Sequence, residues 1–363
     1  MALTTPLARK MGIRYPIFGL AHNIDVMVAL GKAGGYPVFG AARSMPEEIA
    51  EEARIMKDRL GDLPFGIDLM LPSTVGDDTD REGTKSNLPD SHKAFVQELT
   101  EKYKVPPATK PTFFSSQIRS QQLFEEQMAA TLESGAHSFA SAVGMPPEMI
   151  QRAKDHGKVT FSLVGAPRHA EKAKAAGVDV IVAQGYDAGG HTGPIGTFSL
   201  VPQVVEVAGD TPVLAAGGVG HGRHIAASFG LGAQGVWLGT AWLASKEHAL
   251  CDALLNKLLK SDSLNTTISL SHSGKSCRIV KSAWSEEWDR PDAPEPLKMP
   301  YQQVLTADLV AGVNEHEIEP LLYEATGQSI AWFNELKTVD EIMQRLVSET
   351  EVALDNMQKQ LAG

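Results

Sequence analysis

A histidine inside a glycine-rich loop is the strongest candidate for chemistry in this sequence. His191 lies in the segment Ala183–Gly193, AQGYDAGGHTG, which begins at the end of a short apolar run. A loop rich in glycine can pass close to a flat ligand because no side chains stand in the way. Histidine titrates near neutral pH, so its imidazole suits proton transfer or stabilisation of an anionic substrate. The pattern predicts a catalytic imidazole over a bound ligand, although a loop histidine that only bonds to backbone fits the same residues.

Three further polar residues deserve comparison with this histidine. Gln184 ends the apolar run, where its amide either hydrogen-bonds the edge of a heterocycle or packs inside the fold. Asp187 either orients His191 or is a solvated turn residue, and we favour the turn. Lys275, in the segment SGKSC, is a residue to which we assign no role.

A second segment combines the features of a phosphate site. Thr211–Thr240 reads as a strand, a glycine-rich turn, a helix, a second strand and a Gly-Thr pair. Gly217 and Gly218 follow the first of these strands, and Gly239 and Thr240 end the second. Glycine lets the backbone approach an anion, and free N–H groups at a helix start can bind one. The two turns predict a bound phosphate, although tight turns without a ligand also use such glycines.

Eight short apolar, β-branched runs position these residues. Such runs are typical of parallel strands covered on both faces, and helix-like segments separate most of them. The pattern predicts an α/β fold, a (β/α)8 TIM barrel with its chemistry at the carboxyl ends of the strands, and an open sheet is the alternative. The expected strands are Pro16–Ala21, Tyr36–Ala41, Phe65–Met70, Ser138–Gly144, Val159–Gly165, Val178–Gln184, Pro212–Ala216 and Gly235–Gly239. The expected helices are Asp25–Lys32, Pro46–Leu60, Pro146–His156, Arg168–Ala176 and His221–Phe229.

Two stretches interrupt this alternation. Leu71–Gln117 is long and polar and is expected to form an excursion or lid over the active-site face. Cys251–Glu317 contains a proline-rich stretch and predicts a small cap or substrate subdomain. Ile318–Leu361 has a helical pattern and is expected to return to the barrel. We therefore predict a barrel made of residues 1–250 and 318–363, with a C-terminal cap at 251–317.

Composition narrows the classes of partner. A net charge of −11 argues against nucleic acid, whose phosphates require a cationic face. The chain has no apolar run of transmembrane length and no signal-peptide pattern, so a cytoplasmic enzyme without a membrane partner is expected. Cys251 and Cys277 form no metal-type cluster and are expected to be free thiols, and no metal site is expected. The oligomeric state stays open, and a homodimer is compatible with the sequence.

The segment Ala183–Gly193 resembles the AQGxEAGGHxG signature of nitronate monooxygenases, formerly called 2-nitropropane dioxygenases. The block LAAGGVGHGRHIAASFGLGAQGVWLGTAWLAS is similar to that family as well. The likeness extends from about Tyr15 to Ser245, with a weaker echo at Gly327-Gln328 and in the last helix. These motifs are specific for the flavoprotein superfamily and much less specific for the substrate.

The resemblance implies FMN on a TIM barrel, held between the barrel and a smaller C-terminal domain. It implies that a small-molecule substrate, a propionate nitronate or an alkyl nitronate, is oxidised with O2 to a carbonyl compound and nitrite. His191 matches the catalytic histidine, which would remove the α-proton of a nitroalkane or polarise its nitro group. The FMN phosphate would be held by Gly217, Gly218, Gly239 and Thr240, and the flavin would lie against Ala21, His22, Asn23, Gln184, Gly189 and Gly190, with Asp68 close by.

Asp68 departs from the family pattern. The usual motif GVNL has asparagine where this sequence, GIDL, has Asp68. A carboxylate near the flavin disfavours the reduced, anionic ring unless the carboxylate is paired or protonated. The fourth strand (137–144) and the long excursion differ from the family pattern too. The resemblance therefore supports the choice of FMN as cofactor more strongly than the choice of nitronate as substrate.

Two other functions stay open. An FMN barrel of this kind can be an NAD(P)H-dependent reductase of quinones or enoyl thioesters, in which NADH or NADPH bleaches the flavin anaerobically. A phosphate-binding barrel without flavin, such as an isomerase or aldolase of sugar phosphates, would be colourless. No lysine stands clearly at the end of an expected strand, where Schiff-base chemistry would need one.

Overall fold

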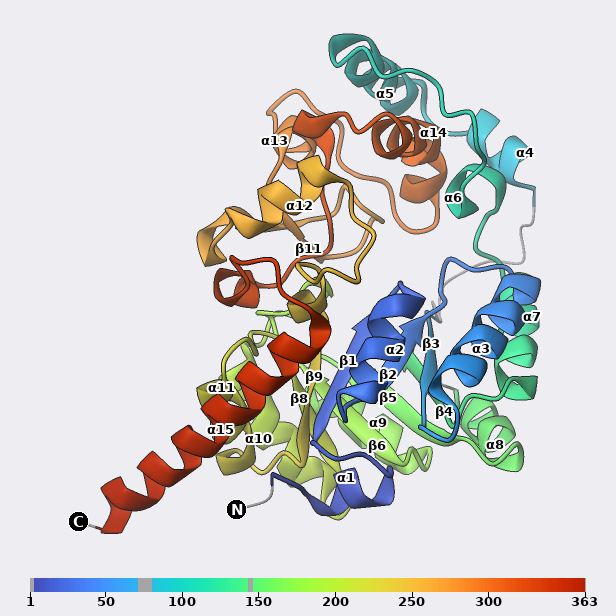
Figure 1. The fold of residues 1–363 in the computed structure, drawn as a ribbon. Coiled ribbons are helices and arrows are strands. Elements are labelled where there is room, and N and C mark those ends of the chain that lie inside the picture. Colours follow the sequence, from blue (N-terminus) through green and yellow to red (C-terminus); the bar gives the residue numbers. More distant parts are fainter. Residues whose placement is uncertain (1–2, 71–79, 143–145, 363) are drawn as a thin grey trace.

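Eight parallel strands close into a barrel, which confirms the expected fold (Figure 1). This computed structural model describes residues 3–70, 80–142 and 146–362. The last barrel strand pairs with the first. All eight expected strands are present, while Val143 and Gly144, at the end of the fourth, lie outside the described residues. The barrel strands are β1 Ile17–Ala21, β2 Tyr36–Gly40, β3 Gly66–Met70, β4 Ser138–Ala142, β5 Val159–Val164, β6 Val180–Gln184, β8 Val213–Ala216 and β9 Gly235–Leu238.

Helices cover the outside of this barrel (Figure 1). In α3 (Pro46–Leu60), proline stands in the first turn together with Glu47 and Glu48, and the last turn holds Lys57 and Arg59. Both the proline and this order of charges favour a helix. The five helices expected from the sequence are confirmed to within two residues at each end. The other barrel helices are α2 Ile24–Lys32, α7 Gln121–Glu133, α8 Pro147–Asp155, α9 Pro167–Ala175, α10 Thr197–Ala208 and α11 Gly222–Gly230.

Aromatic side chains fill the amino-terminal end of the barrel. The ring centres of Phe18, Tyr36 and Phe161 lie between 5.2 and 6.0 Å apart. The helix α1 (Pro6–Lys10) contributes buried Leu7 to the same cluster. Because this end is packed with side chains, ligands are left to the carboxyl end of the strands.

A cap lies over the carboxyl ends of the strands (Figure 1). It contains a three-stranded sheet in the order β10–β11–β7. β10 (Thr266–Ser269) and β11 (Cys277–Val280) come from the predicted cap, whereas β7 (Gly190–His191) belongs to the glycine–histidine loop. The candidate catalytic histidine is therefore a residue of the cap sheet. The remaining cap elements are α12 Asp252–Leu259, η2 Ser263–Asn265, α13 Ala283–Trp288 and α14 Tyr301–Glu315.

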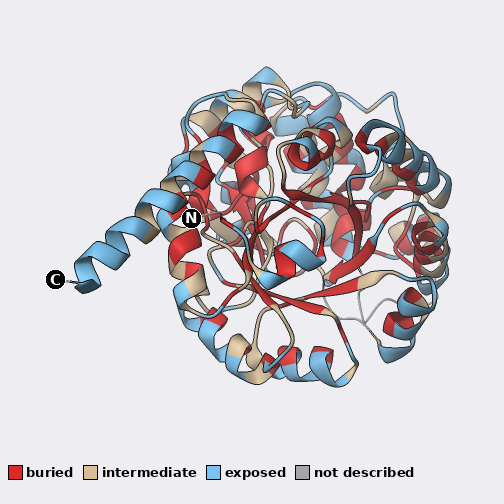
Figure 2. Cartoon of the chain, turned by 60° about the horizontal axis from the view of Figure 1, so that its bottom comes forward, coloured by how far each residue is buried: buried red, intermediate tan, exposed pale blue. Residues whose placement is uncertain are grey.

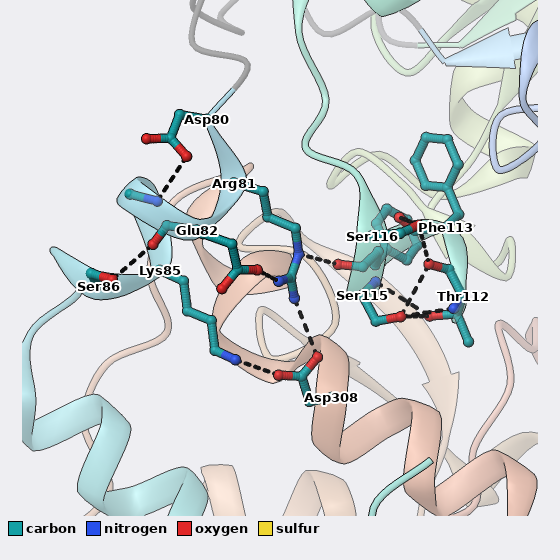
Figure 3. A network of polar contacts seen from close by, with 12 residues as sticks. Asp80, Arg81, Glu82, Lys85, Ser86, Thr112, Phe113, Ser115, Ser116 and Asp308 are labelled. Atoms are coloured by element: carbon teal, nitrogen blue, oxygen red, sulfur yellow. Dashed lines mark hydrogen bonds and ion pairs between the residues drawn. The ribbon is translucent and has the colours of Figure 1, made fainter. Parts of the chain in front are cut away.

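The described part of the excursion joins this cap. Its helices α4 (Arg81–Ser86), α5 (Asp90–Lys102) and α6 (Phe113–Ser116) pack against α14. Figure 3 shows the polar link, in which buried Arg81 donates to Asp308 of α14 at 3.3 Å. Residues 71–79, the first part of the expected excursion, lie outside the described residues. The division into a barrel and a cap at 251–317 stays a prediction, and these contacts place residues 81–116 beside the cap.

The expected helix Ile318–Leu361 is wrong in its first half. That part forms only two short 3₁₀ helices, η3 (Glu319–Leu321) and η4 (Gln328–Trp332). Pro320 lacks the N–H that a continuing helix needs, and the backbone of Gly327 is extended.

The second half, α15 (Val339–Ala362), is helical and returns to the barrel as expected. It packs against α2 and α11, and its last turns are exposed and project from the molecule (Figure 2). Both cysteines are free thiols, as the sequence predicts. Among the described helices, none combines the length and the apolar character that crossing a membrane requires.

Candidate active site

His191 lies where the barrel meets the cap. Its backbone pairs with Cys277 of β11, and its Nε2 shares a hydrogen bond of 2.7 Å with the hydroxyl of Ser273. Ser273 is completely buried in the turn between β10 and β11, so the cap fixes the orientation of the imidazole. The sequence placed His191 on the catalytic face but gave no indication that Ser273 is its partner.

The imidazole of His191 is neutral at neutral pH. Desolvation by burial is the main cause, and the charges of Arg119, Lys275 and Arg43 reinforce it, which lowers the pKa of His191 to about 4. A neutral imidazole can accept or donate a hydrogen bond, but it is a weak base. The site therefore favours a substrate that brings its own negative charge.

Two neighbours of His191 hold the glycine–histidine loop in shape. The amide nitrogen of Gln184 donates to the carbonyl of His191 at 2.6 Å. The carboxylate of Asp187 accepts from the backbone N–H of Thr197 at 2.9 Å. Asp187 lies in a turn, as favoured from the sequence, and it also caps the start of α10, which the sequence did not predict.

The turn after β8 lies against this same loop. Gly217 and Gly218 have φ angles of +94° and +73°, which L-residues with side chains rarely adopt. A Cβ on Gly217 would lie 2.9 Å from the nitrogen of Ala188 and 3.0 Å from the oxygen of Gly185. Glycine at 217 is therefore required by both its conformation and its neighbours.

The turn after β9 reaches the loop from the other side. Thr240 begins the 3₁₀ helix η1 (Thr240–Trp242), and its Oγ1 accepts from the backbone N–H of Gly327 at 2.9 Å. A Cβ on Gly327 would lie only 2.8 Å from the nitrogen of Gly189. The structure thus brings the two predicted phosphate turns to one glycine loop.

Several backbone donors at these turns are available to a ligand. Within the described ranges, the N–H groups of Gly218, Gly239 and Thr240 meet no protein acceptor. Such unpaired N–H groups at the ends of neighbouring strands suit a bound anion. Gly189 and Gly190, in the glycine–histidine loop that contacts both turns, have no side chains to cover the backbone.

The end of β1 contributes a second histidine. The side chain of His22 is exposed, and its Nδ1–H donates to the carbonyl of Gly40 at 2.6 Å. Since a carbonyl only accepts, the proton resides on Nδ1 and Nε2 is an acceptor. Although part of His22 reaches solvent, the surrounding protein desolvates the ring, and this desolvation together with the charge of Arg43 lowers the pKa of His22. Its neighbour Ala21 is buried, and Asn23 uses its side chain to cap α2, so its Oδ1 is engaged within the fold.

Asp68 is a buried carboxyl group on the inner side of β3. Ile67 and Leu69, on either side, pack into the core outside the barrel, and neighbouring residues of a strand face opposite ways. Asp68 is 7% exposed, and its Oδ1 has no hydrogen-bond partner among the described residues. Burial raises the pKa of Asp68 well above its usual range, which favours the neutral acid over the carboxylate. The raised pKa of Asp68 therefore lessens the conflict between a carboxylate and an anionic flavin.

Asp68→Asn should stabilise the protein above neutral pH. Folding raises the pKa of Asp68 above its unfolded value of about 3.9. The stabilisation by protonated Asp68 is therefore complete below the unfolded pKa, and it is lost as the pH rises through the folded pKa. We expect the Tm of the variant to exceed that of the wild type by about 2–4 °C at pH 8, and the two values to converge towards pH 4. A Tm difference that is constant with pH would contradict a buried neutral acid.

A cavity of about 1050 Å³ opens beside this site, at the carboxyl ends of β5 and β6. The residues that line it include His191, Gln184 and Lys275, together with Met149 of α8 and Lys172 of α9. Lys275, which the sequence left without a role, thus shares a cavity with the candidate catalytic residue.

Two arginines whose charges act on His191 were not predicted from the sequence. Arg43 follows β2, Arg119 precedes α7, and the positive charge of each helps to lower the pKa of His191. The position of Arg43 just after an expected strand was an available clue, because barrel chemistry lies at that end. Arg119 offered no such clue, since it stands just beyond an excursion whose path the sequence does not define.

The chain is similar to known proteins in both its sequence and its fold. Residues 4–349 match the sequence profile of the family "Nitronate monooxygenase". The chain is 36% identical to the Mycobacterium tuberculosis protein named "Putative monooxygenase Rv1533", over 96% of each chain. It is 27% identical to a "Probable nitronate monooxygenase" of Staphylococcus saprophyticus, over 84% of this chain and 86% of that one.

Two solved structures share the fold. One is nitroalkane oxidase from Streptomyces ansochromogenes, with a TM-score of 0.80 and 23% identity over 96% of this chain and 99% of that one. The other is FabK from Thermotoga maritima, with a TM-score of 0.75 and 22% identity over 98% and 99% of the two chains. The resemblance seen in the sequence is therefore confirmed: the chain is an oxidoreductase and belongs to the nitronate monooxygenase family.

Proposed function

We propose that this protein is an FMN-dependent nitronate monooxygenase, which oxidises an alkyl nitronate with O2 to a carbonyl compound and nitrite. The observation that carries the proposal is a neutral His191, held by Ser273 beside the glycine turns that follow β8 and β9. Membership of the family supports the type of reaction. The choice of nitronate as substrate depends on the electrostatics of the site.

The residues around His191 fit an FMN molecule. Unpaired backbone N–H groups at Gly218, Gly239 and Thr240, with the close turn at Gly217, suit its phosphate. The glycine backbone at Gly189 and Gly190, with Gln184 and His22 at the strand ends, suits a flat ring. Asp68 is a buried carboxyl group whose raised pKa favours its neutral form. When bound, FMN supplies the redox chemistry by taking up electrons and passing them on.

The low pKa of His191 selects the form of the substrate. A base whose conjugate acid has a pKa of about 4 removes the α-proton of a neutral nitroalkane only weakly. A nitronate has already lost that proton and carries a negative charge. His191 then has to orient the nitronate by hydrogen bonding, while the charges of Lys275, Arg43 and Arg119 favour its binding.

Anaerobic titration of the purified protein tests this function. We expect flavin absorbance bands that the nitronate of 1-nitropropane bleaches at least about 100-fold faster than 1-nitropropane itself, with no response to NADH or NADPH. Bleaching by a nicotinamide, without a response to the nitronate, would replace the proposal by the reductase alternative. A colourless protein that takes up no FMN would instead support the other alternative, a phosphate-binding barrel that uses no flavin.

Ser273→Ala should lower turnover without loss of the fold. The substitution removes one buried hydroxyl and leaves Nε2 of His191 without its partner, which costs about 1 kcal/mol and frees the ring to rotate. We expect kcat to fall about 10-fold with little change in KM, measured by oxygen consumption. Ser271→Ala is the matched control, since Ser271 is equally buried but accepts from Trp284 at 2.9 Å. A similar fall in kcat for both variants would remove the specific role of Ser273.

A further inference from the structure

The C-terminal helix α15 is bonded to the turn between β8 and α11 (residues 217–221), which we call the β8–α11 turn. α15 packs against α11, whose first residue, Gly222, follows this turn (Figure 1). The carboxylate of Glu349 accepts from the backbone N–H of Gly222 at 2.9 Å. Arg345 donates to the carbonyl of Gly220 at 3.3 Å and to Glu349 at 3.2 Å. Two charged side chains of the last helix thus bond to the backbone at the end of this turn.

Close packing joins the turn to the C-terminal segment as well. A Cβ on Gly222 would lie 2.2 Å from the backbone nitrogen of Thr350. A Cβ on Gly220 would lie 2.8 Å from the ring of Trp332, whose backbone carbonyl accepts from Arg345 at 3.3 Å. Glycine at both positions lets α15 and η4 approach the backbone of the turn closely. A shift of α15 would therefore move the turn.

The carboxylate of Glu349 occupies the N-terminal end of α11. A helix start favours an anion, and the first turn of α11 contains no acidic residue of its own. Because Glu349 already fills this position, a phosphate depends on the free N–H groups of the turns and not on the start of α11. One of these groups belongs to Gly218, in the same turn as Gly220. The shape of the β8–α11 turn therefore decides where that N–H points.

We propose that Glu349 and Arg345 are positioning residues for the cofactor, which hold the β8–α11 turn in the shape that presents its N–H groups to the FMN phosphate. The inference rests on the proposed function, because it takes FMN as the ligand of this turn. Both side chains act through the backbone of Gly220 and Gly222, so neither has to contact the cofactor. A turn that is ordered before the ligand arrives has a smaller entropy cost of binding.

Comparison of FMN with riboflavin tests this role, because riboflavin has the same ring and lacks the phosphate. Glu349→Ala removes the acceptor of the Gly222 N–H, and we expect the Kd of FMN to rise about 10-fold. The Kd of riboflavin should stay within about 2-fold. Titration of the cofactor-free, full-length protein, followed by flavin fluorescence, measures both constants. An equal rise for the two ligands would show a general loss of structure and would overturn the inference.

Glu349→Gln separates the hydrogen bond from the charge. Glutamine keeps an oxygen that can accept from the N–H of Gly222, but it carries no negative charge. Because the bond shapes the turn, we expect the Kd of FMN in this variant to stay within about 3-fold of the wild type. A Kd raised as far as in Glu349→Ala would show that the charge, and not the bond, affects the cofactor, and would overturn the positioning role.

Asp355 and Lys359 provide the matched control on the same helix. They form an ion pair with the i,i+4 spacing of Arg345 and Glu349, but they lie in the exposed last turns of α15 (Figure 2). Asp355→Ala should leave the Kd of FMN and of riboflavin within about 2-fold of the wild type. A rise in the Kd of FMN equal to that in Glu349→Ala would show an effect of helix stability alone, which contradicts a specific role at the turn.

Hydrogen exchange of the cofactor-free protein examines the turn without any ligand. We expect the amide of Gly222 to exchange at least about 10-fold faster in Glu349→Ala than in the wild type or in Asp355→Ala. An unchanged rate would overturn the inference, since the turn would then not depend on α15. Failure of the wild type to bind FMN would contradict the proposed function, whereas equal FMN affinity in the wild type and Glu349→Ala would overturn the inference alone.

Discussion

His191→Ala should lose most of its turnover and keep both its fold and its flavin. The substitution removes the imidazole but leaves the backbone pairing of residue 191 with Cys277. Loss of a positioned acid–base or hydrogen-bonding group typically costs about 100- to 10,000-fold in rate, and we expect kcat to fall within that range. Oxygen consumption with a nitronate measures the rate, and the flavin absorbance per protein measures cofactor retention.

His272→Ala is the matched control for this result. The ring of His272 lies 6.1 Å from that of His191, but its Nδ1 is hydrogen-bonded to Tyr323 at 3.1 Å. We expect a change in kcat of less than about 5-fold for this control. Turnover that survives in His191→Ala, or falls equally in both variants, would remove His191 from the mechanism.

The pH profile of the wild type gives an independent check on His191. A pKa of about 4 means that the ring gains a proton only in acid, so kcat/KM should not change through this group between about pH 6 and 8. It should fall as the pH approaches 4 and the imidazole becomes charged. An inflection near pH 6.5 that disappears in His191→Ala would contradict a buried neutral ring.

Gly217→Ala should release the cofactor. The residue has φ +94°, and its new Cβ would lie 2.9 to 3.0 Å from backbone atoms of Ala188 and Gly185. Since neither backbone atom can rotate away, the turn has to move, and the N–H of Gly218 moves with it. We expect FMN affinity to fall at least about 30-fold, or about 2 kcal/mol, measured by reconstituting the cofactor-free protein.

Two other glycines provide the controls. Gly230→Ala, at the end of α11, places a Cβ where no atom lies within 4 Å, so affinity and Tm should not change. Gly239→Ala is more informative, because the nearest atom to its Cβ is the oxygen of Leu20 at 3.8 Å. This variant should fold normally. Weaker FMN binding would then show that the new Cβ interferes with the bound cofactor and not with the fold. Wild-type affinity in Gly217→Ala would exclude a phosphate at this turn.

Local features of the sequence were sufficient to predict the barrel. The strands are short apolar runs that can be buried on both faces, and helix starts such as Pro46-Glu47-Glu48 carry their own charge pattern. Gly217 and Gly218 adopt the positive φ angles that justify glycine in a turn. Because barrel strands present their carboxyl ends on one face, topology alone placed His191, Gln184 and the two turns together.

Partners far apart in the chain could not be predicted in the same way. Ser273 is hydrogen-bonded to His191, and Arg119 acts on that ring, only because the cap folds back over the barrel. Asp187 looked like an ordinary turn residue until the structure showed its bond to the start of α10. The 3₁₀ helix that follows Gly327 was also not predicted. Gly327 packs against the glycine loop, and this contact cannot be deduced from the spacing of apolar residues along the chain.

The pairing of β7 with β11 determines how a substrate can enter. Lifting the cap would break the ladder between Gly190–His191 and Cys277–Arg278, and with it the bonds of 3.0 and 3.2 Å from Arg278 to the carbonyl of Tyr186. The histidine would lose its own support in that motion, so a hinged lid would disable the site it exposes. The cavity of about 1050 Å³, lined by residues of α7, α8 and α9 together with His191, offers a substrate a route to the imidazole while the cap stays in place.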